Sequence, residues 1–365
     1  MNLRIPGPTP CPPEVLQAMT KPMINHRGPE FAQIIKRIAA RLQEFFQTKN
    51  DILVLTTAGT GGMESAVVNT MSPGDKVLSA SCGEFGDRFA KIAETYGAQV
   101  TRLKAELGKA VDPDSIRKAL SADPSITAVL LTHNETSTGV TNDLKALAAV
   151  CKEFDKLVVV DAVSSLSSID LQTDAWKCDV VVTGSQKGWM VPPGLAMVSV
   201  SEEGWKAVAN AKMPRFYFDY QRAKSSADRG QTPWTPAVSV YFALDYALDL
   251  MAKEGMQNIF ARHARIAAHT RQRVKDLGLA LFADEAVASN TVTAVHVPET
   301  LQARELLRIL REDFQVVMAG GQGSLDGKIF RIGHLGYVQQ EDIDKAMVAL
   351  EEALARLGFA QAAAV

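Results

Sequence analysis

The segment DVVVTGSQKGWMVPPG (179–194) indicates the fold class, because an apolar run leads directly into a turn rich in glycine and proline. Similar apolar runs recur in the first 200 residues and alternate with helical patterns. Strands that are apolar throughout are typical of a parallel sheet with helices on both faces. The predicted strands are 51–56, 76–80, 98–102, 126–132, 157–161, 179–183 and 195–200, and the helices between them 62–72, 86–97, 113–121 and 142–155. We therefore expect an α/β layered domain.

Outside this region the pattern changes. Residues 30–46 have the apolar spacing of a long amphipathic helix, and the prolines of 6–13 favour an extended arm. A long helical stretch (237–277) precedes strands at 291–297 and 328–333 and a final helix at 340–357. We predict an N-terminal arm (1–20), a large domain (21–256) and a small α+β domain (257–365).

Composition excludes several classes of protein. With 39 basic and 41 acidic residues among 365, the net charge is −2, unlike the basic footprint of nucleic-acid binders. No apolar run reaches the roughly 18 residues of a membrane helix. The four cysteines are scattered without metal-type spacing, which is typical of reduced thiols in a cytoplasmic protein and predicts no metal site.

Lys187 follows the strand 179–183, at the edge where α/β sheets bind ligands. Partial desolvation there would lower its pKa and free the amine for imine chemistry. The alternative is a solvated lysine in a loop.

Asp161 closes the apolar run 157–161, where an unpartnered carboxylate would be costly. A cationic heterocycle would be a partner; at about 4 Å and an effective dielectric of about 20, such a pair is worth about 4 kcal/mol before desolvation. Capping of a following helix is the alternative.

Three further features are weaker. TTAGTGGME (56–64) places small residues before a helix, where backbone N–H groups bind anions, although an ordinary tight turn would look the same. Phe85 in SCGEFGDRF (81–89) could stack on a flat ring or belong to the core. Arg331 in GKIFRIGHLG (327–336) suits a substrate carboxylate or a structural ion pair.

Along the chain these features follow one another as anion-binding turn, stacking aromatic, strand-end aspartate, strand-end lysine and late arginine. In that order they resemble the class V aminotransferases of the fold type I pyridoxal-5′-phosphate (PLP) enzymes. The alanine–glyoxylate and serine–glyoxylate (serine–pyruvate) branch is the most similar. The likeness is carried by PGPTP (6–10), NHRGPEF (25–31), TTAGTGGME (56–64), HNETSTGV (133–140), VVVDAVSS (158–165), GSQKGWMVPPG (184–194), QTPWTPAVS (231–239) and FRIGHLG (330–336). It implies a large domain with a mostly parallel sheet between helices, plus a smaller α+β domain.

The resemblance also implies a role for each matching residue. Lys187 would bind the cofactor aldehyde and shuttle the proton, Asp161 would hold the pyridinium, and Phe85 would stack on the ring. The other implied cofactor contacts are Thr136 at the 3-hydroxyl, and Ala58, Gly59, Thr60 and Gln186 at the phosphate. Gln231, Thr232 and Thr235 would reach the phosphate of the neighbouring subunit, which implies a homodimer with shared active sites. Arg331 and the backbone around Gly7 would bind the substrate carboxylate.

Two positions depart from one branch of that family, which has histidine at Thr60 and tyrosine at Gln231. The implied reaction is ping-pong transfer from a small amino acid, alanine or serine, to glyoxylate or a similar 2-oxo acid. Aspartate or another donor, cysteine desulfuration and a non-catalytic subunit are the alternatives. The last cysteine, Cys178, lies before the C-terminal half, where desulfuration needs one.

Overall fold

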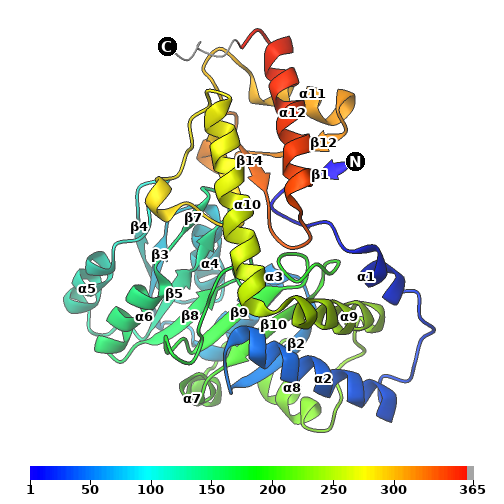
Figure 1. Ribbon diagram of the computed structural model, residues 1–365. Coiled ribbons are helices and arrows are strands. Elements are labelled where there is room, and N and C mark those ends of the chain that lie inside the picture. The colour runs from blue at the N-terminus through cyan, green and yellow to red at the C-terminus, as the bar shows by residue number, and fades with distance from the viewer. Residues whose placement is uncertain (360–365) are drawn as a thin grey trace.

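The computed structural model describes residues 1–359 and shows a broad unit around a central sheet, with a narrower unit beside it (Figure 1). Residues 360–365, the end of the predicted small domain, lie outside the described residues. Within 1–359, no helix combines the length and apolar character needed to cross a membrane. The predicted division at residues 20/21 and 256/257 stays a prediction.

The central sheet has strand order β2-β10-β9-β8-β5-β3-β4. Its strands are β2 (Asp51–Thr57), β3 (Lys76–Ser81), β4 (Gln99–Lys104), β5 (Ala128–Thr132), β8 (Leu157–Asp161), β9 (Val180–Gly184) and β10 (Gly194–Val200). All neighbours run parallel except β10, which is antiparallel to β2 and β9. The connection from β9 to β10 holds no crossover helix, and a parallel pair needs one. The mostly parallel sheet is therefore confirmed, with one reversed strand.

Helices cover both faces of the sheet, which explains why its strands are apolar throughout. Val159 of β8 packs toward one face, and Val158 and Val160 pack toward the other. The first face is covered by α3 (Gly59–Thr70), α4 (Glu84–Thr95), α7 (Glu202–Asn210) and α8 (Tyr220–Ala227). The second is covered by α2 (Pro29–Phe46), α5 (Pro113–Ala122), α6 (Leu144–Glu153) and α9 (Val238–Glu254). A short hairpin, β6 (Asn134–Glu135) and β7 (Val140–Thr141), follows β5.

The predicted helical stretch 237–277 is two helices rather than one. It breaks at Gly255, whose φ of 85° lies in the left-handed region that favours glycine. There α9 ends and α10 (Met256–Asp276) leaves the sheet for the narrower unit (Figure 1).

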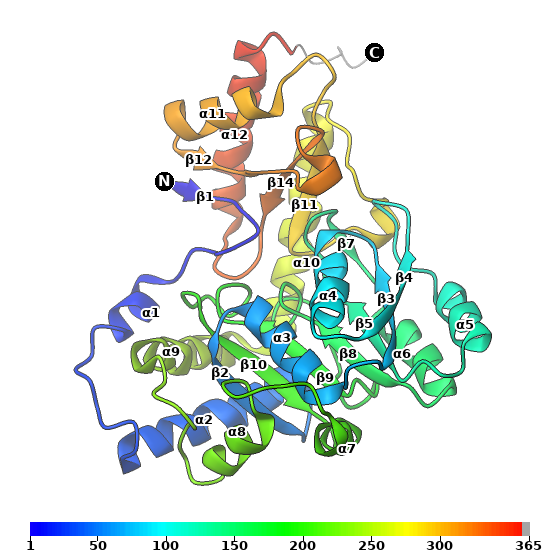
Figure 2. The same cartoon turned by 180° about the vertical axis from the view of Figure 1, so that it is seen from behind.

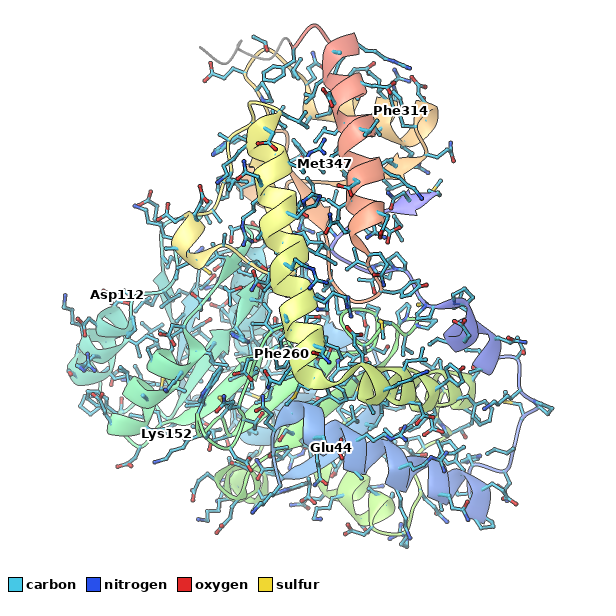
Figure 3. The ribbon with its side chains drawn as sticks, in the orientation of Figure 1. Glu44, Asp112, Lys152, Phe260, Phe314 and Met347 are labelled. Atoms are coloured by element: carbon cyan, nitrogen blue, oxygen red, sulfur yellow. The ribbon has the colours of Figure 1, made fainter. Side chains whose placement is uncertain are left out.

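The narrower unit has a core of its own between α10, a small sheet and two further helices. The strands are β11 (Val292–His296), β14 (Ile329–Gly333) and β13 (Ala319–Gly320), with α11 (Ala303–Asp313) and α12 (Gln340–Arg356). Figure 3 shows Met347 of α12 in this unit, where it belongs to the buried core. The strands and final helix predicted from the sequence are confirmed.

The N-terminal segment connects the two units. β1 (Asn2–Leu3) pairs with β12 (Val316–Val317) of the narrower unit, and the chain then descends to α1 (Pro13–Ala18) on the broad one (Figure 2). Residues between them form neither helix nor strand, as the prolines predict. The Thr9 amide donates to the Gln186 carbonyl oxygen (3.0 Å), so the arm crosses the turn that carries Lys187.

Candidate active site

A cavity of about 260 Å³ opens where β2, β8 and β9 end. Parallel strands bring their carboxyl ends to one edge of a sheet, and ligands bind at such an edge. Residues from the predicted site line this cavity, although they come from distant parts of the chain: Gly7, Gly59, Thr60, Phe85, Asp161, Gln186 and Lys187. The structure therefore brings most of the predicted residues together.

The turn after β9 fixes where Lys187 lies. A side chain at Gly188 would collide with the hydroxyls of Ser167 and Ser168, so only glycine fits there. Next to it, Trp189 is fully buried and anchors the end of the turn in the core. Burying an aromatic side chain of this size stabilises the fold by about 3 kcal/mol. The turn therefore holds the backbone of Lys187 in a fixed position.

The amine of Lys187 points into the cavity rather than into solvent. Its Nζ donates to the carbonyl oxygen of Pro6 in the arm (2.6 Å). Burial lowers the pKa of Lys187 to about 8; the charge of Asp161 opposes this shift, and those of Arg331 and Arg88 add to it. Because Nζ lies in the cavity and is bonded to the arm, the solvated-loop alternative is wrong. The lowered pKa favours the neutral, reactive amine.

Asp161 lies buried at the end of β8 and lines the same cavity. Burial raises the pKa of Asp161 to about 7, and the nearby Glu135 adds to the rise. Its Oδ1 accepts the Val163 amide (2.9 Å). The segment between β8 and β9 contains no helix, so capping of a following helix is wrong. This carboxylate is suited to a cationic partner in the cavity.

The N-terminus of α3 lies at one end of the cavity. Ala58 occupies the N-cap position, and no side chain caps the helix, which leaves its first N–H groups available. A side chain at Gly59 would come within 2.9 Å of Val163, so this backbone requires glycine. Facing it, Gln186 has a buried Oε1 with no hydrogen-bond partner within the described chain. Thr60 is exposed at the mouth.

Phe85 is held in place by a buried carboxylate that the sequence analysis missed. Glu135 accepts the amides of Phe85 (3.2 Å) and Gly86 (3.1 Å) and the hydroxyl of Ser137 (2.6 Å). Burial raises the pKa of Glu135, and these hydrogen bonds oppose the rise. Phe85 is half-buried and lines the cavity, so it is not a plain core residue.

Arg331 and Thr136 lie behind the cavity wall rather than on it. Arg331 is buried and donates to the carbonyl oxygens of Gly320 (2.8 Å) and Thr136 (3.2 Å). Burial lowers the pKa of Arg331 to about 10. It forms no ion pair with any residue in 1–359, so the structural ion-pair alternative is wrong. The Thr136 hydroxyl donates to the Ser164 hydroxyl (2.9 Å).

The segment 231–235 lies away from this cavity in its own chain. Gln231 and Thr232 line a separate cavity of about 90 Å³. Arg27 donates to the Gln231 side chain (3.1 Å) and to the Thr232 carbonyl oxygen (2.7 Å). Thr235 is exposed. The structure describes a single chain, so the role of these residues at a neighbouring site stays a prediction.

The sequence analysis also missed five residues that line the cavity, namely Pro8, Met63, Arg88, Val163 and Pro193. Val163 packs beside Gly59, two positions after Asp161, and Arg88 lies one helical turn after Phe85. Val163 and Arg88 both lie within motifs quoted in the sequence analysis. Each is two or three residues from a predicted site residue, and this closeness in sequence could have identified them.

Comparison with known proteins agrees with this geometry. A family model, Aminotransferase class-V, matches residues 1–346. The small subunit of a soluble hydrogenase from Synechococcus is 44% identical over 98% of this chain and 94% of that protein. The L-aspartate–glyoxylate aminotransferase of Paracoccus denitrificans is 38% identical over 97% of this chain and 91% of that protein.

Solved structures show the same relationship in three dimensions. The alanine–glyoxylate aminotransferase of Nostoc superposes with a TM-score of 0.93 at 31% identity, over 96% of this chain and 94% of that one. Enzymes of this kind use pyridoxal 5′-phosphate and act on small amino acids and 2-oxo acids. The chain belongs to the class V aminotransferases, in the branch of the alanine–glyoxylate and serine–glyoxylate enzymes.

Proposed function

We propose that this aminotransferase moves an amino group from a small amino acid, alanine or serine, to glyoxylate or a similar 2-oxo acid. The reaction is ping-pong, so the first oxo acid leaves before the second binds. Aspartate is the alternative donor. The relatives named for alanine–glyoxylate and aspartate–glyoxylate transfer support glyoxylate as acceptor and leave the donor to experiment.

One observation supports the proposal most strongly: Lys187 and Asp161 line a single cavity with an uncapped helix N-terminus. The cavity thus contains a reactive amine, a buried carboxylate and an anion site. PLP has an aldehyde, a basic ring nitrogen and a phosphate. These three groups match the three features of the cavity.

The residues of the cavity fit the cofactor one by one. We assign Lys187 to the aldehyde, Asp161 to the ring nitrogen, and Phe85 and Val163 to the two faces of the ring. We assign the phosphate to Ala58, Gly59, Thr60 and Gln186, whose side-chain NH2 group can donate a hydrogen bond to a phosphate oxygen. Thr136 is the candidate for the ring hydroxyl. When bound, PLP supplies an aldehyde that condenses with amines and a ring that accepts electrons.

The side chains of the protein transfer the proton, stabilise the charge of the cofactor ring and bind the substrate. Nζ of Lys187 would remove the proton from the substrate α-carbon, acting as a base, and would then give that proton up again, acting as an acid. Asp161 stays ionised opposite a cation and keeps that cation charged. Arg331 binds the substrate carboxylate with its planar fork, and the arm at Gly7 shields the amine from water. A side chain at Gly7 would come within 2.6 Å of Nζ, so the arm can lie this close only as glycine.

A homodimer completes the site in this proposal. Gln231, Thr232 and Thr235 extend to the phosphate of a neighbouring subunit, and their position outside their own chain's cavity leaves them available. A cytoplasmic location is also part of the proposal, and the four free cysteines support it.

A non-catalytic role is the second candidate, because two relatives are named as subunits of a soluble hydrogenase. The intact pair of Lys187 and Asp161 favours catalysis. Desulfuration is disfavoured because Cys178 is buried beside the sheet, where burial raises the pKa of its thiol.

A donor panel tests the proposal. Purified enzyme with PLP is assayed with alanine, serine, aspartate and glutamate against glyoxylate and pyruvate, and kcat/KM is compared. Transfer to glyoxylate from a small donor, with parallel lines in double-reciprocal plots, supports it. If no donor gives transfer, the proposed function is refuted and the non-catalytic role is favoured.

The reactivity of Lys187 toward a small acylating reagent should rise with pH with a midpoint at about 8, because burial lowers its pKa to about 8. Below that pH the amine is protonated and does not react. Asp161 raises the pKa of Lys187, so Asp161→Asn should move the midpoint to lower pH. Pulse acetylation of the cofactor-free protein, followed by peptide mass spectrometry, measures this, with exposed lysines as internal reference. A midpoint near 10.4, the ordinary value for lysine, would contradict the buried position.

A further inference from the structure

Arg88 is a cation at the cavity for which the proposed chemistry has no use. It lies on α4, lines the cavity together with Lys187, and is exposed. Its guanidinium carbon lies 4.7 Å from the centroid of the Phe85 ring. Within residues 1–359 its side chain forms no hydrogen bond and no ion pair. Arg88 is thus a charged fork beside the reactive amine that contacts no carboxylate of the described residues directly, although its charge acts on the pKa of Asp161.

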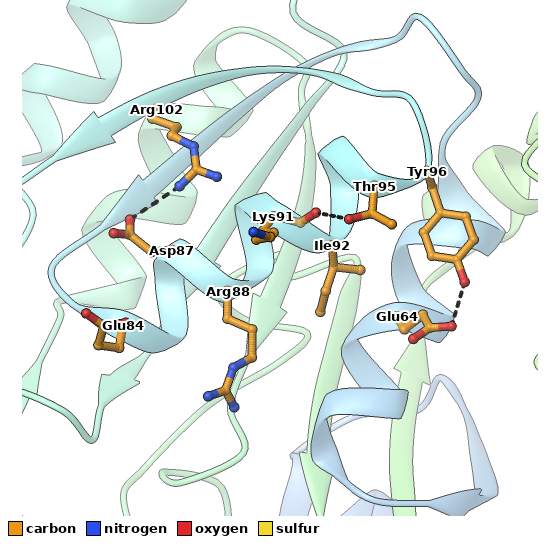
Figure 4. A pocket seen from close by; sticks show the side chains of 9 residues that line it. All are labelled: Glu64, Glu84, Asp87, Arg88, Lys91, Ile92, Thr95, Tyr96 and Arg102. Atoms are coloured by element: carbon orange, nitrogen blue, oxygen red, sulfur yellow. Dashed lines mark hydrogen bonds and ion pairs between the residues drawn. The ribbon is translucent and has the colours of Figure 1, made fainter. Parts of the chain in front are cut away.

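The acidic residues nearby do not neutralise it. Arg88 also borders an outer groove of about 630 Å³ between α3 and α4, which contains Glu64, Glu84 and Asp87. Figure 4 shows Arg88 extending away from these carboxylates. Asp87 pairs with Lys104 (2.6 Å), and Glu64 accepts the Tyr96 hydroxyl (2.6 Å). The charge of Arg88 therefore remains available to a ligand.

Two arginines from different units lie near the Lys187 amine: Arg88 lines the cavity, and Arg331 is buried behind its wall. Arg331 approaches from β14 of the narrower unit and Arg88 from α4 of the broad one, and both lower the pKa of Lys187. Arg331 is assigned to the carboxylate that every amino acid carries. A guanidinium binds a carboxylate through two parallel hydrogen bonds, so a second arginine suits a second carboxylate.

We propose that Arg88 binds the side-chain carboxylate of a dicarboxylic amino donor, aspartate or glutamate, and so extends the donor range beyond alanine and serine. This inference rests on the proposed aminotransferase function. Arg88 acts on specificity: it adds binding energy only for donors with a second negative group. Neutral donors leave it in contact with solvent and the Phe85 ring.

The test compares Arg88→Gln and Arg88→Lys with Lys91→Gln, in the PLP-loaded enzyme. Lys91 is an exposed cation on the same helix that borders the outer groove but not the Lys187 cavity, so it controls for surface charge. For each variant, kcat/KM is measured with aspartate, glutamate and alanine, and the affinity for PLP is measured by titration.

Arg88→Gln should lower the ratio of kcat/KM for the preferred dicarboxylic donor to that for alanine by about 10- to 100-fold, chiefly through KM. Arg88→Lys should restore part of the ratio, because it keeps the charge and loses the fork. Lys91→Gln should leave the ratio unchanged. PLP affinity should be similar in all variants.

Three results would overturn the inference. They are an unchanged ratio in Arg88→Gln, an equal loss for all donors with weakened PLP binding (which would assign Arg88 to the cofactor phosphate), and a parent enzyme that uses alanine but neither dicarboxylic donor. In each of these cases the proposed function stands. Failure of the parent enzyme with every donor would instead refute the proposed function.

Discussion

Replacing Lys187 with alanine should reduce transamination by at least about 10⁴-fold, the upper range for a positioned proton-transfer group. The variant loses both the amine that binds the cofactor aldehyde and the group that moves the α-proton. Removal of the side chain leaves the turn intact, because Gly188 and Trp189 hold it independently of Lys187. Steady-state kinetics with the best donor of the panel measures the loss.

Lys118→Ala is the matched control. Lys118 is exposed on α5, which does not border the cavity, so its removal should change kcat/KM by less than about twofold. Thermal unfolding of both variants should lie close to that of the parent. Activity of Lys187→Ala within tenfold of the parent would refute the assignment of this amine.

Asp161→Asn should reduce kcat by about 10³-fold. A carboxylate opposite a cation at about 4 Å is worth about 4 kcal/mol at an effective dielectric of about 20, and each 1.36 kcal/mol is tenfold in rate. Asparagine has the same shape and can still accept the Val163 amide, so the change removes charge and little else. Rapid mixing of the PLP-loaded variant with donor measures the slowed proton-transfer step.

Asp112→Asn serves as its control. Asp112 caps α5 through its side chain, a role that asparagine fills equally well, and it is exposed. Its substitution should leave kcat unchanged. A normal rate in Asp161→Asn would show that the buried charge has no part in the reaction.

Much of the fold was predictable because strands that are buried on both faces consist almost entirely of apolar residues. Runs such as VVVD (158–161) have no polar alternation, and the structure buries both of their faces. Chain direction was not visible in the same pattern: β10 is as apolar as its neighbours and antiparallel to them. The break at Gly255 was also hidden, since one glycine within a helical pattern is often tolerated.

The site was predictable to the extent that its residues follow strands. Asp161 ends one apolar run and Lys187 follows another in the next turn, and parallel strands bring such residues to one edge of the sheet. Glu135 and Arg88 gave weaker signals, because an acid in a short hairpin and an arginine on a helix are ordinarily solvated. Only the packing of α4 against the hairpin shows that Glu135 is buried and holds Phe85.

Trapping the cofactor tests the central claim most directly. The PLP-loaded protein is reduced with borohydride, digested and examined by mass spectrometry for the modified peptide. We expect the cofactor on Lys187 alone, and none trapped after an amino donor has been added in excess. Modification of another lysine, or no covalent cofactor at all, would contradict the assignment of the site.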